Sequence, residues 1–310
     1  EMGSYVLGDL IARGGMGEVW HATHRFLARP AAVKLIKPDV LGTMTKEQRE
    51  VLVQRFHREA RAAANLRSPH TIQLFDFGVT DDGTFYYVME LLNGMDLQSL
   101  VEEYGPIPPP RTVHILRQAC ESLAEAHDRG LIHRDIKPAN IQVCCMGHYF
   151  DYVKVLDFGL VKSQAAAARL DPGLTAPNVV AGTPAYMSPE GALGEPVDQR
   201  TDIYALGCVA YWMLTGRQVF EGQGVVQLMA RHIHTPPEPP SLYSLVQIPS
   251  DLEELVLACL SKQPEDRPAS ARALADRLAQ CEVESEWSRE HARLWWDSRL
   301  TPEPALTFGD

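Results

Sequence analysis

A glycine cluster stands between two predicted strands, in the segment Ile11-Ala12-Arg13-Gly14-Gly15-Met16-Gly17-Glu18-Val19. Glycines let backbone N–H groups approach phosphate oxygens without a side chain in the way. A strict G-x-G-x-x-G spacing would require glycine at position 12, where this chain has Ala12. From these residues alone, a phosphate-binding loop and a glycine-rich hairpin turn are equally good interpretations.

Lys34 interrupts an apolar predicted strand, Ala31-Ala32-Val33-Lys34-Leu35-Ile36. A lysine that points inward needs an anionic partner, because burying an unpaired ammonium group is costly. Glu59 is the candidate partner, since it follows Leu52 by seven residues on the inner stripe of a predicted helix. The alternative is a surface position for Glu59, paired with Arg55 four residues earlier.

A base, two cations and an amide stand within ten residues, in Leu131-Ile132-His133-Arg134-Asp135-Ile136-Lys137-Pro138-Ala139-Asn140. The triplet Asp157-Phe158-Gly159 follows the apolar strand predicted for Val153 to Leu156. With the glycine loop, the strand lysine and the helix glutamate, these motifs stand in the order of the protein kinase family, which the chain resembles from about Tyr5 to about Gln280.

The second half of the chain extends this resemblance. Residues 182–190, Gly-Thr-Pro-Ala-Tyr-Met-Ser-Pro-Glu, match the end of the family's activation segment, with Ser188 in place of the alanine of A-P-E. The resemblance makes Arg267 the buried partner of Glu190. Lys137, two residues after Asp135, is typical of Ser/Thr rather than Tyr kinases. The sequence of the glycine loop is most similar to that of the bacterial Ser/Thr kinases.

The resemblance implies Mg·ATP-dependent phosphorylation of Ser/Thr hydroxyls on proteins. Asp135 would orient the substrate hydroxyl, and Lys137 would balance the charge of the γ-phosphate. Lys34, held by Glu59, would hold the α- and β-phosphates. The metal ligands would be Asn140 and Asp157, whose hard oxygen atoms suit Mg²⁺ and also Mn²⁺.

The same resemblance places the adenine ring above Gln142, where the family has an apolar residue. An amide in this position must find a hydrogen-bond partner, so we expect Gln142 to alter nucleotide affinity. The departure at Ala12 lies at the flank of the loop and should have a modest effect. The residues expected around the nucleotide are Ile11, Ala12, Arg13, Gly14, Gly15, Met16, Gly17, Glu18, Val19, Ala32, Lys34, Met89 as gatekeeper, Glu90, Leu92 and Gln142.

Regulation is also predicted from the family pattern. Arg134 directly precedes Asp135, as in kinases whose activation segment is ordered by a phosphate that pairs with arginine. Between Gly159 and Gly182 the only hydroxyl side chains are Ser163 and Thr175. We predict autophosphorylation of Thr175, in trans within a transient homodimer. Thr183 should instead shape the floor on which the substrate peptide lies.

The elements that must position these residues follow from periodicity and turn signals. Strands are predicted at 5–12, 18–22, 30–36, 71–77 and 84–90, with one helix at 46–66 among them. A joint at 91–96 contains Asn93-Gly94, and helices follow at 111–129, 202–215, 225–232, 251–261 and 270–281. The prediction is an α+β bilobal kinase fold with a β-rich small lobe and a mostly helical large lobe.

We expect one kinase domain over 5–281, with the small lobe at about 5–90, the joint at about 91–95 and the large lobe at about 96–281. The tail 282–310 is predicted to be a C-terminal tail or a juxtamembrane-type linker. Its residues Trp287, Leu294, Trp295 and Trp296 favour a short helix on the large lobe over a docking surface. His133 is expected to pack against Phe158 rather than to carry protons.

Composition limits the function classes. Lys and Arg total 29 against 40 Asp and Glu, which gives a net charge of −11 and argues against nucleic-acid binding. Six cysteines without C-x-x-C spacing indicate reduced thiols in a cytoplasmic protein. No stretch is apolar over the ~20 residues of a membrane span, so a membrane tether would lie outside 1–310.

Two other function classes compete with a protein kinase. A pseudokinase would keep the fold as a nucleotide-binding scaffold without turnover, but Lys34, Glu59, Asp135, Asn140 and Asp157 are all intact. A small-molecule kinase of related fold would not need residues 182–190 or Arg267, which resemble the peptide-positioning apparatus of protein kinases. The natural substrate and the upstream signal do not follow from the sequence.

Overall fold

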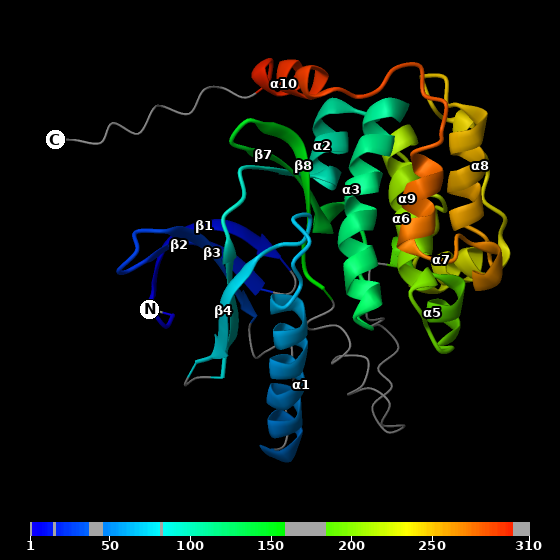
Figure 1. The fold of residues 1–310 in the computed structure, drawn as a ribbon. Coiled ribbons are helices and arrows are strands. Elements are labelled where there is room, and N and C mark those ends of the chain that lie inside the picture. The colour runs from blue at the N-terminus through cyan, green and yellow to red at the C-terminus, as the bar shows by residue number, and fades with distance from the viewer. Residues whose placement is uncertain (1, 15–16, 37–45, 81–82, 159–183, 300–310) are drawn as a thin grey trace.

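The computed structural model describes residues 2–14, 17–36, 46–80, 83–158 and 184–299. A small lobe built on a β-sheet lies beside a larger lobe built mainly of helices (Figure 1). The predicted α+β bilobal fold is therefore confirmed. Gly15, Met16, Ser163, Thr175, Thr183 and the tail from residue 300 onward lie outside the described residues.

The small lobe is a five-stranded antiparallel sheet in the order β1-β2-β3-β5-β4, with one helix packed against β4. Its elements are β1 (Tyr5–Gly14), β2 (Gly17–His24), β3 (Pro30–Ile36), α1 (Lys46–Ala64), β4 (Leu74–Val79) and β5 (Phe85–Glu90). The predicted apolar stripe of α1 faces inward, since Phe56, Ala60 and Ala63 are at most 5% exposed. Burial of this stripe orients α1, and both Arg58 and Glu59 line a hollow that Arg134 of the large lobe also lines.

A second sheet, in the order β6-β7-β8, opens the large lobe directly after the joint. Its strands are β6 (Gly94–Asp96), β7 (Ile141–Met146) and β8 (Tyr149–Val155). The helices are α2 (Leu97–Tyr104), α3 (Pro109–Asp128), α5 (Pro189–Leu193), α6 (Arg200–Thr215), α7 (Val225–His234), α8 (Ser250–Cys259), α9 (Ala271–Leu278) and α10 (Arg289–Asp297). Among the described residues, no helix is long and apolar enough to cross a membrane.

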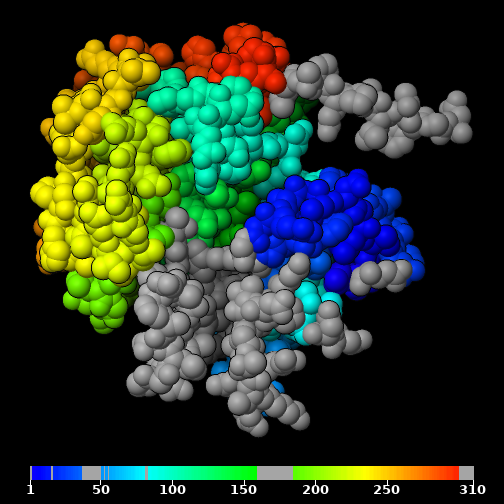
Figure 2. All heavy atoms as spheres, turned by 180° about the vertical axis from the view of Figure 1, so that it is seen from behind, coloured from blue at the N-terminus to red at the C-terminus, as the bar shows by residue number. Residues whose placement is uncertain are grey.

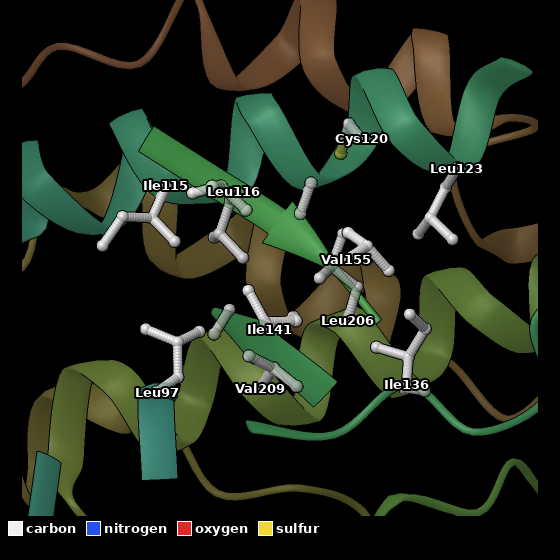
Figure 3. Close-up of a cluster of buried hydrophobic side chains, with 14 of the residues drawn as sticks. Leu97, Ile115, Leu116, Cys120, Leu123, Ile136, Ile141, Val155, Leu206 and Val209 are labelled. Atoms are coloured by element: carbon white, nitrogen blue, oxygen red, sulfur yellow. The ribbon is translucent and has the colours of Figure 1, made fainter. Parts of the chain in front are cut away.

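The core of the large lobe lies between α3, α6 and the second sheet. Figure 3 shows the side chains of α3, α6, β7 and β8 pointing toward one another in this space. All of them are at most 3% exposed, and each buried Leu or Ile contributes about 1.5–3 kcal/mol to stability. Ile136 of the 131–140 segment belongs to the same cluster, so the predicted catalytic loop is anchored to a rigid core.

The predicted strand at 71–77 was placed too early. The strand itself spans Leu74–Val79, and the residues before it cross to the large lobe instead. Thr71 forms a single bridge to Val155, and Ile72 donates its N–H to the same residue's carbonyl at 3.0 Å. The periodicity did not reveal this change of partner, because both environments bury apolar side chains.

Candidate active site

The loop that carries Asp135 is held by Asp202, a fully buried residue in the first turn of α6. Its carboxylate accepts hydrogen bonds from the backbone N–H groups of His133 and Arg134, both at 2.8 Å. Arg134 has a φ of +62°, which is unfavourable for a residue with a side chain and is stabilised by these bonds. Sequence reasoning missed this role of Asp202; its only signal was an acidic residue in an otherwise apolar helix.

Asp135 lies between an amide and an ammonium group. Asn140 Nδ2 donates to the backbone carbonyl of Asp135 at 2.8 Å and to its Oδ2 at 3.0 Å. Lys137 Nζ lies 3.3 Å from the same Oδ2. The N–H of Leu156 donates to the carbonyl of Asn140 at 2.9 Å, which brings Asp157 beside this group. The predicted residues Asp135, Lys137, Asn140 and Asp157 therefore share one site.

His133 packs as the sequence predicts. It is fully buried, and its ring centroid lies 4.6 Å from that of Phe158. Its Nε2 lies 2.7 Å from the carbonyl oxygen of Leu156, which fixes the ring from the other side. A ring held this way supports the loop and is not exposed to a substrate.

Lys34 forms its ion pair with Asp157. Burial opposes ionisation of this aspartate, but the neighbouring ammonium group of Lys34 holds the pKa of Asp157 below its ordinary value. The backbone at Asp157 has a φ of +57°, and this turn carries the carboxylate toward β3. The pair therefore gathers a cation and an anion where the predicted phosphates and metal would lie.

Among the ion pairs of the described residues, Lys34 is paired with Asp157, because the left-handed turn at Asp157 places its carboxylate against the ammonium group. Glu59 lines a surface hollow together with Arg58, Arg129, Arg134 and Phe158. A role of Glu59 in holding Lys34 stays a prediction.

Strands β1 and β2, on either side of Gly15 and Met16, pair as an antiparallel hairpin. Gly14 lies opposite Gly17 and Ala12 lies opposite Val19 in the register of these strands. A Cβ atom on Gly17 would lie 1.8 Å from the carbonyl oxygen of Leu35, so only glycine fits this close approach to β3. At the base of the hairpin, Glu18 accepts from Trp20 Nε1 at 3.1 Å and pairs with Arg13 at 3.2 Å.

The expected adenine-binding residues lie where β3 and β5 meet the joint. Met89 is opposite Ala32 in the sheet, and it lines a small pocket with Lys34 and Asp157. The N–H of Glu90 donates to the carbonyl of Gln73 at 3.0 Å, so an adenine contact with Glu90 would use its carbonyl oxygen. The gatekeeper position, the lysine and the D-F-G aspartate are thus brought together.

Gln142 lies on β7 with Asp96 of β6 and Lys154 of β8 as its cross-strand neighbours. Its side chain is half-buried, whereas Ile141 and Val143 on the opposite face are completely buried. The side chain therefore points out of the core at the level of the joint. A place for Gln142 under the adenine ring stays a prediction.

Glu190 and Arg267 form the buried pair that the sequence predicted. Arg267 donates from both terminal nitrogens to the two carboxylate oxygens, each at 2.8 Å. Thr201 adds a bond of 2.8 Å to Oε1. Burial opposes ionisation, yet these bonds hold the pKa of Glu190 below its ordinary value. The pair fixes the segment that ends the predicted activation loop against α6 and the loop before α9.

Comparisons with known proteins identify the family of the chain. The family described as Protein kinase domain matches residues 5–279. A serine/threonine-protein kinase of Myxococcus xanthus, pkn3, is 39% identical over 275 residues, which cover 88% of this chain and 49% of that protein. The PknB kinase of Mycobacterium leprae is 38% identical over 270 residues, which cover 86% of this chain and 41% of that protein. The chain thus spans about half the length, or less, of these curated relatives.

Solved structures give the same fold. The PknI kinase domain of Mycobacterium tuberculosis superimposes with a TM-score of 0.69 at 24% identity and covers 90% of this chain and 96% of its own. Rad53 in complex with AMP-PNP gives a TM-score of 0.70 at 24% identity, covering 88% of this chain and 64% of its own. At this level of identity, the likeness concerns the fold alone.

Proposed function

Because the chain belongs to the protein kinase family, we propose that it transfers the γ-phosphate of ATP to Ser and Thr hydroxyls of proteins. The observation that carries the proposal is the grouping of Asp135 with Lys137 at 3.3 Å and Asn140 at 3.0 Å, beside the Lys34–Asp157 pair. Phosphoryl transfer depends on positioning and charge neutralisation more than on covalent catalysis, and this group supplies both.

Each residue of the group has a distinct task in the proposed reaction. Asp135 accepts the hydrogen bond of the substrate hydroxyl and aims its oxygen at the phosphorus atom. Lys137 balances the negative charge on the transferred group, and Lys34 holds the phosphates that stay behind. Asn140 and Asp157 offer the two oxygen ligands for Mg²⁺, or Mn²⁺, which supplies further charge neutralisation at the phosphates when bound.

Among the described residues, no three or more His, Cys, Asp or Glu side chains form a ready metal cage. This fits the proposal, because Mg²⁺ at phosphates takes one or two protein ligands and completes its shell with phosphate oxygens and water. Removing the divalent ion with EDTA should abolish transfer, and adding Mg²⁺ back should restore it.

The proposed activation step is autophosphorylation of Thr175 between two copies of the chain. Support comes from the hollow of about 340 Å³ that Arg58 of α1, Arg129 and Arg134 line together. Glu59 belongs to the same lining and Arg129 is paired with Glu125 at 2.7 Å, so Arg58 and Arg134 are the arginines that we propose for the doubly charged phosphate of a phosphothreonine. One of them, Arg134, directly precedes the catalytic loop aspartate, so a phosphate bound there would couple the activation segment to Asp135. Thr183 is proposed to shape the peptide floor near Asp135 and Lys137.

We also propose that residues 5–281 form the catalytic domain and that its macromolecular partners are protein substrates and, transiently, a second copy of the chain. Nucleic acid is not among them, because a net charge of −11 opposes binding to phosphate backbones. A cytoplasmic location for the domain, with any membrane tether outside residues 1–310, stays part of this proposal.

The test is incubation of the purified chain with radiolabelled ATP and Mg²⁺, with and without a generic basic protein. Label on the chain and on the added protein is the expected result. Nucleotide binding without any label would instead identify a pseudokinase scaffold. Label that appears only on small molecules of a metabolite extract would identify a small-molecule kinase.

A further inference from the structure

A buried carboxylate in β8 is completed by the tail of the chain. Asp151 is fully buried, and Arg111 of α3 donates to its two oxygens, each at 2.8 Å. Trp287 and Trp296 donate their indole N–H groups to the same two oxygens, each at 2.7 Å. Four donors thus satisfy one buried charge, and two of the four come from residues beyond the region that matches the kinase family.

The tail also covers the arginine of this pair. The guanidinium carbon of Arg111 lies 3.8 Å from the ring centroid of Trp295 and 5.3 Å from that of Trp287. Arg111 is 2% exposed and Trp296 is 1% exposed, which confirms the prediction that the tail helix packs on the large lobe. Residues 287–297, which we call the tail strap, therefore seal an ion pair that would otherwise be poorly satisfied.

The clamped end of β8 is close to the joint between the lobes. Tyr152, the next residue, lies opposite Cys144 of β7, and Cys144 lies opposite Gly94 of β6. Neighbouring strands are about 4.8 Å apart, so the strap and the joint are separated by the width of a three-stranded sheet. A Cβ atom on Gly94 would lie 2.2 Å from the carbonyl oxygen of Val143, so the joint packs directly on β7.

Cys145 connects the two ends of this path. Its N–H donates to the carbonyl oxygen of Asn93, in the joint, at 2.8 Å. Burial raises the pKa of the Cys145 thiol to about 11, and the carboxylates of Asp151 and of Asp297 at the end of α10 act in the same direction. One residue of β7 is therefore hydrogen-bonded to the joint and lies near both carboxylates of the strap region.

A second contact reaches the same place through α2. Trp295 packs edge-on against Tyr104, at the end of α2, with 5.1 Å between ring centroids. The helix starts at its cap Asp96, whose Oδ1 accepts from the N–H of Ser99 at 3.0 Å, and Asp96 is the β6 partner of Gln142. One path from the strap thus ends at Asn93 in the joint, and the other ends at Asp96, the strand partner of Gln142. Figure 1 shows α10 across the end of the β7–β8 hairpin and of α2, and Figure 2 shows it along one edge of the large lobe.

We propose that Trp287 and Trp296 are positioning residues for nucleotide binding, and that the tail strap fixes the joint and the β6-β7-β8 sheet at the height that adenine requires. The inference rests on the proposed ATP-dependent function. The catalytic loop is held separately, by Asp202, so loss of the strap should affect nucleotide affinity far more than the rate at saturating ATP.

The experiment compares the whole chain with Trp287→Phe, Trp296→Phe and the double variant, which keep an aromatic ring and remove the N–H donors. Leu294→Ala is the matched control, since this residue is on the same helix and 53% exposed. KM for ATP and kcat come from peptide phosphorylation, and hydrogen exchange reports on residues 91–96 without nucleotide. A gentler variant, Arg299→Ala, serves in case the double variant does not fold, since it removes a guanidinium group that lies against the rings of Trp295 and Tyr104.

The double variant should raise KM for ATP at least about threefold, within the range of coupling through a packed network, with kcat within about twofold of wild type. Amide hydrogen exchange of residues 91–96 should become faster in the tryptophan variants and should not change in Leu294→Ala. An unchanged KM in a variant whose strap exchanges freely would overturn the inference. A second result would also overturn the inference: a lower kcat at unchanged KM, in proportion to the fraction of protein that has lost its fold. If the wild-type chain binds no ATP, the proposed function fails, while exchange at 91–96 still decides whether the strap controls the joint.

Discussion

Two kinds of paired carboxylate occupy the large lobe and the cleft beside it. Glu190 is paired with Arg267, whose side chain is 0% exposed, and Thr201 also donates to it. In the cleft, the cations that face Asp135 and Asp157 are still partly open to solvent, with Lys137 20% and Lys34 16% exposed. The Glu190–Arg267 pair, which we call the closed pair, joins α5 to the loop before α9 in the folded protein. The open pairs keep a face on which a substrate and a metal ion can be exchanged, which the proposed reaction requires.

The closed pair should dominate stability. Arg267→Met leaves the Glu190 charge buried without its partner, and breaking such a pair costs about 3–5 kcal/mol of unfolding free energy. The matched control is Arg272→Met, because Arg272 pairs with Asp128 on the surface, with side chains 70% and 68% exposed. An exposed pair of this kind contributes about 0–1 kcal/mol. Urea unfolding followed by circular dichroism measures both, and equal losses would contradict the distinction between closed and open pairs.

The open pairs should dominate catalysis and contribute little to stability. Asp135→Asn removes the proposed base while keeping the shape, so phosphoryl transfer should fall at least about a hundredfold with an unchanged unfolding midpoint. ATP affinity, measured by calorimetry, should stay near the wild-type value. Lys34→Met should also abolish turnover, because the phosphates lose their cation.

A surface carboxylate provides the control for Asp135. Asp198 is 51% exposed and pairs with Arg200 outside the cleft, so Asp198→Asn should leave the rate within about twofold of wild type. Self-labelling of purified Asp135→Asn at the wild-type rate would show that the catalytic aspartate is another residue.

The activation segment provides a third comparison, between two arginines. Arg267 is paired with Glu190, whereas Arg134 is proposed to pair with a phosphate on Thr175. Thr175→Ala should lower activity severalfold and leave ATP binding unchanged, because the phosphate that would bind near Arg134 is lost. Mass spectrometry of the wild-type and Asp135→Asn proteins, both made in one host, identifies the site. Phosphate that is absent from Thr175 in the active protein, or equally present in the inactive one, would contradict autophosphorylation there.

The sequence motifs predicted which candidate catalytic residues lie together better than they predicted the contacts that hold these residues in place. The positions of Asp135, Lys137, Asn140 and Asp157 follow from spacing along one loop and one strand, where local geometry leaves little freedom. The ion pair of Lys34 with Asp157 did not follow from spacing, because it depends on the folded turn at Asp157, with a φ of +57°. A single sequence carries no signal for that turn.

Most helices of the large lobe were predicted, including the short α9 and α10, but two short ones were not. The stripe of α1 and the apolar run of α6 are unmistakable, but α2 and α5 have only eight and five residues and were missed. The four donors on Asp151 were also beyond prediction, since Arg111, Trp287 and Trp296 are spread over nearly two hundred residues. Composition did show that a tryptophan-rich tail would prefer to be buried.

The smallest expected effect concerns Gln142, whose amide stands where an apolar side chain would suit the face of adenine. Gln142→Leu removes the need to desolvate the amide on binding, so the Kd for ATP should fall or stay unchanged, and kcat should not change directly. Calorimetry at constant Mg²⁺ measures the affinity. Cys144→Ser, a fully buried change on the same strand, controls for loosening of β7. A large loss of affinity in Gln142→Leu, without such a loss in Cys144→Ser, would mean that the amide of Gln142 contacts the nucleotide. Gln142 would then itself be part of the recognition site.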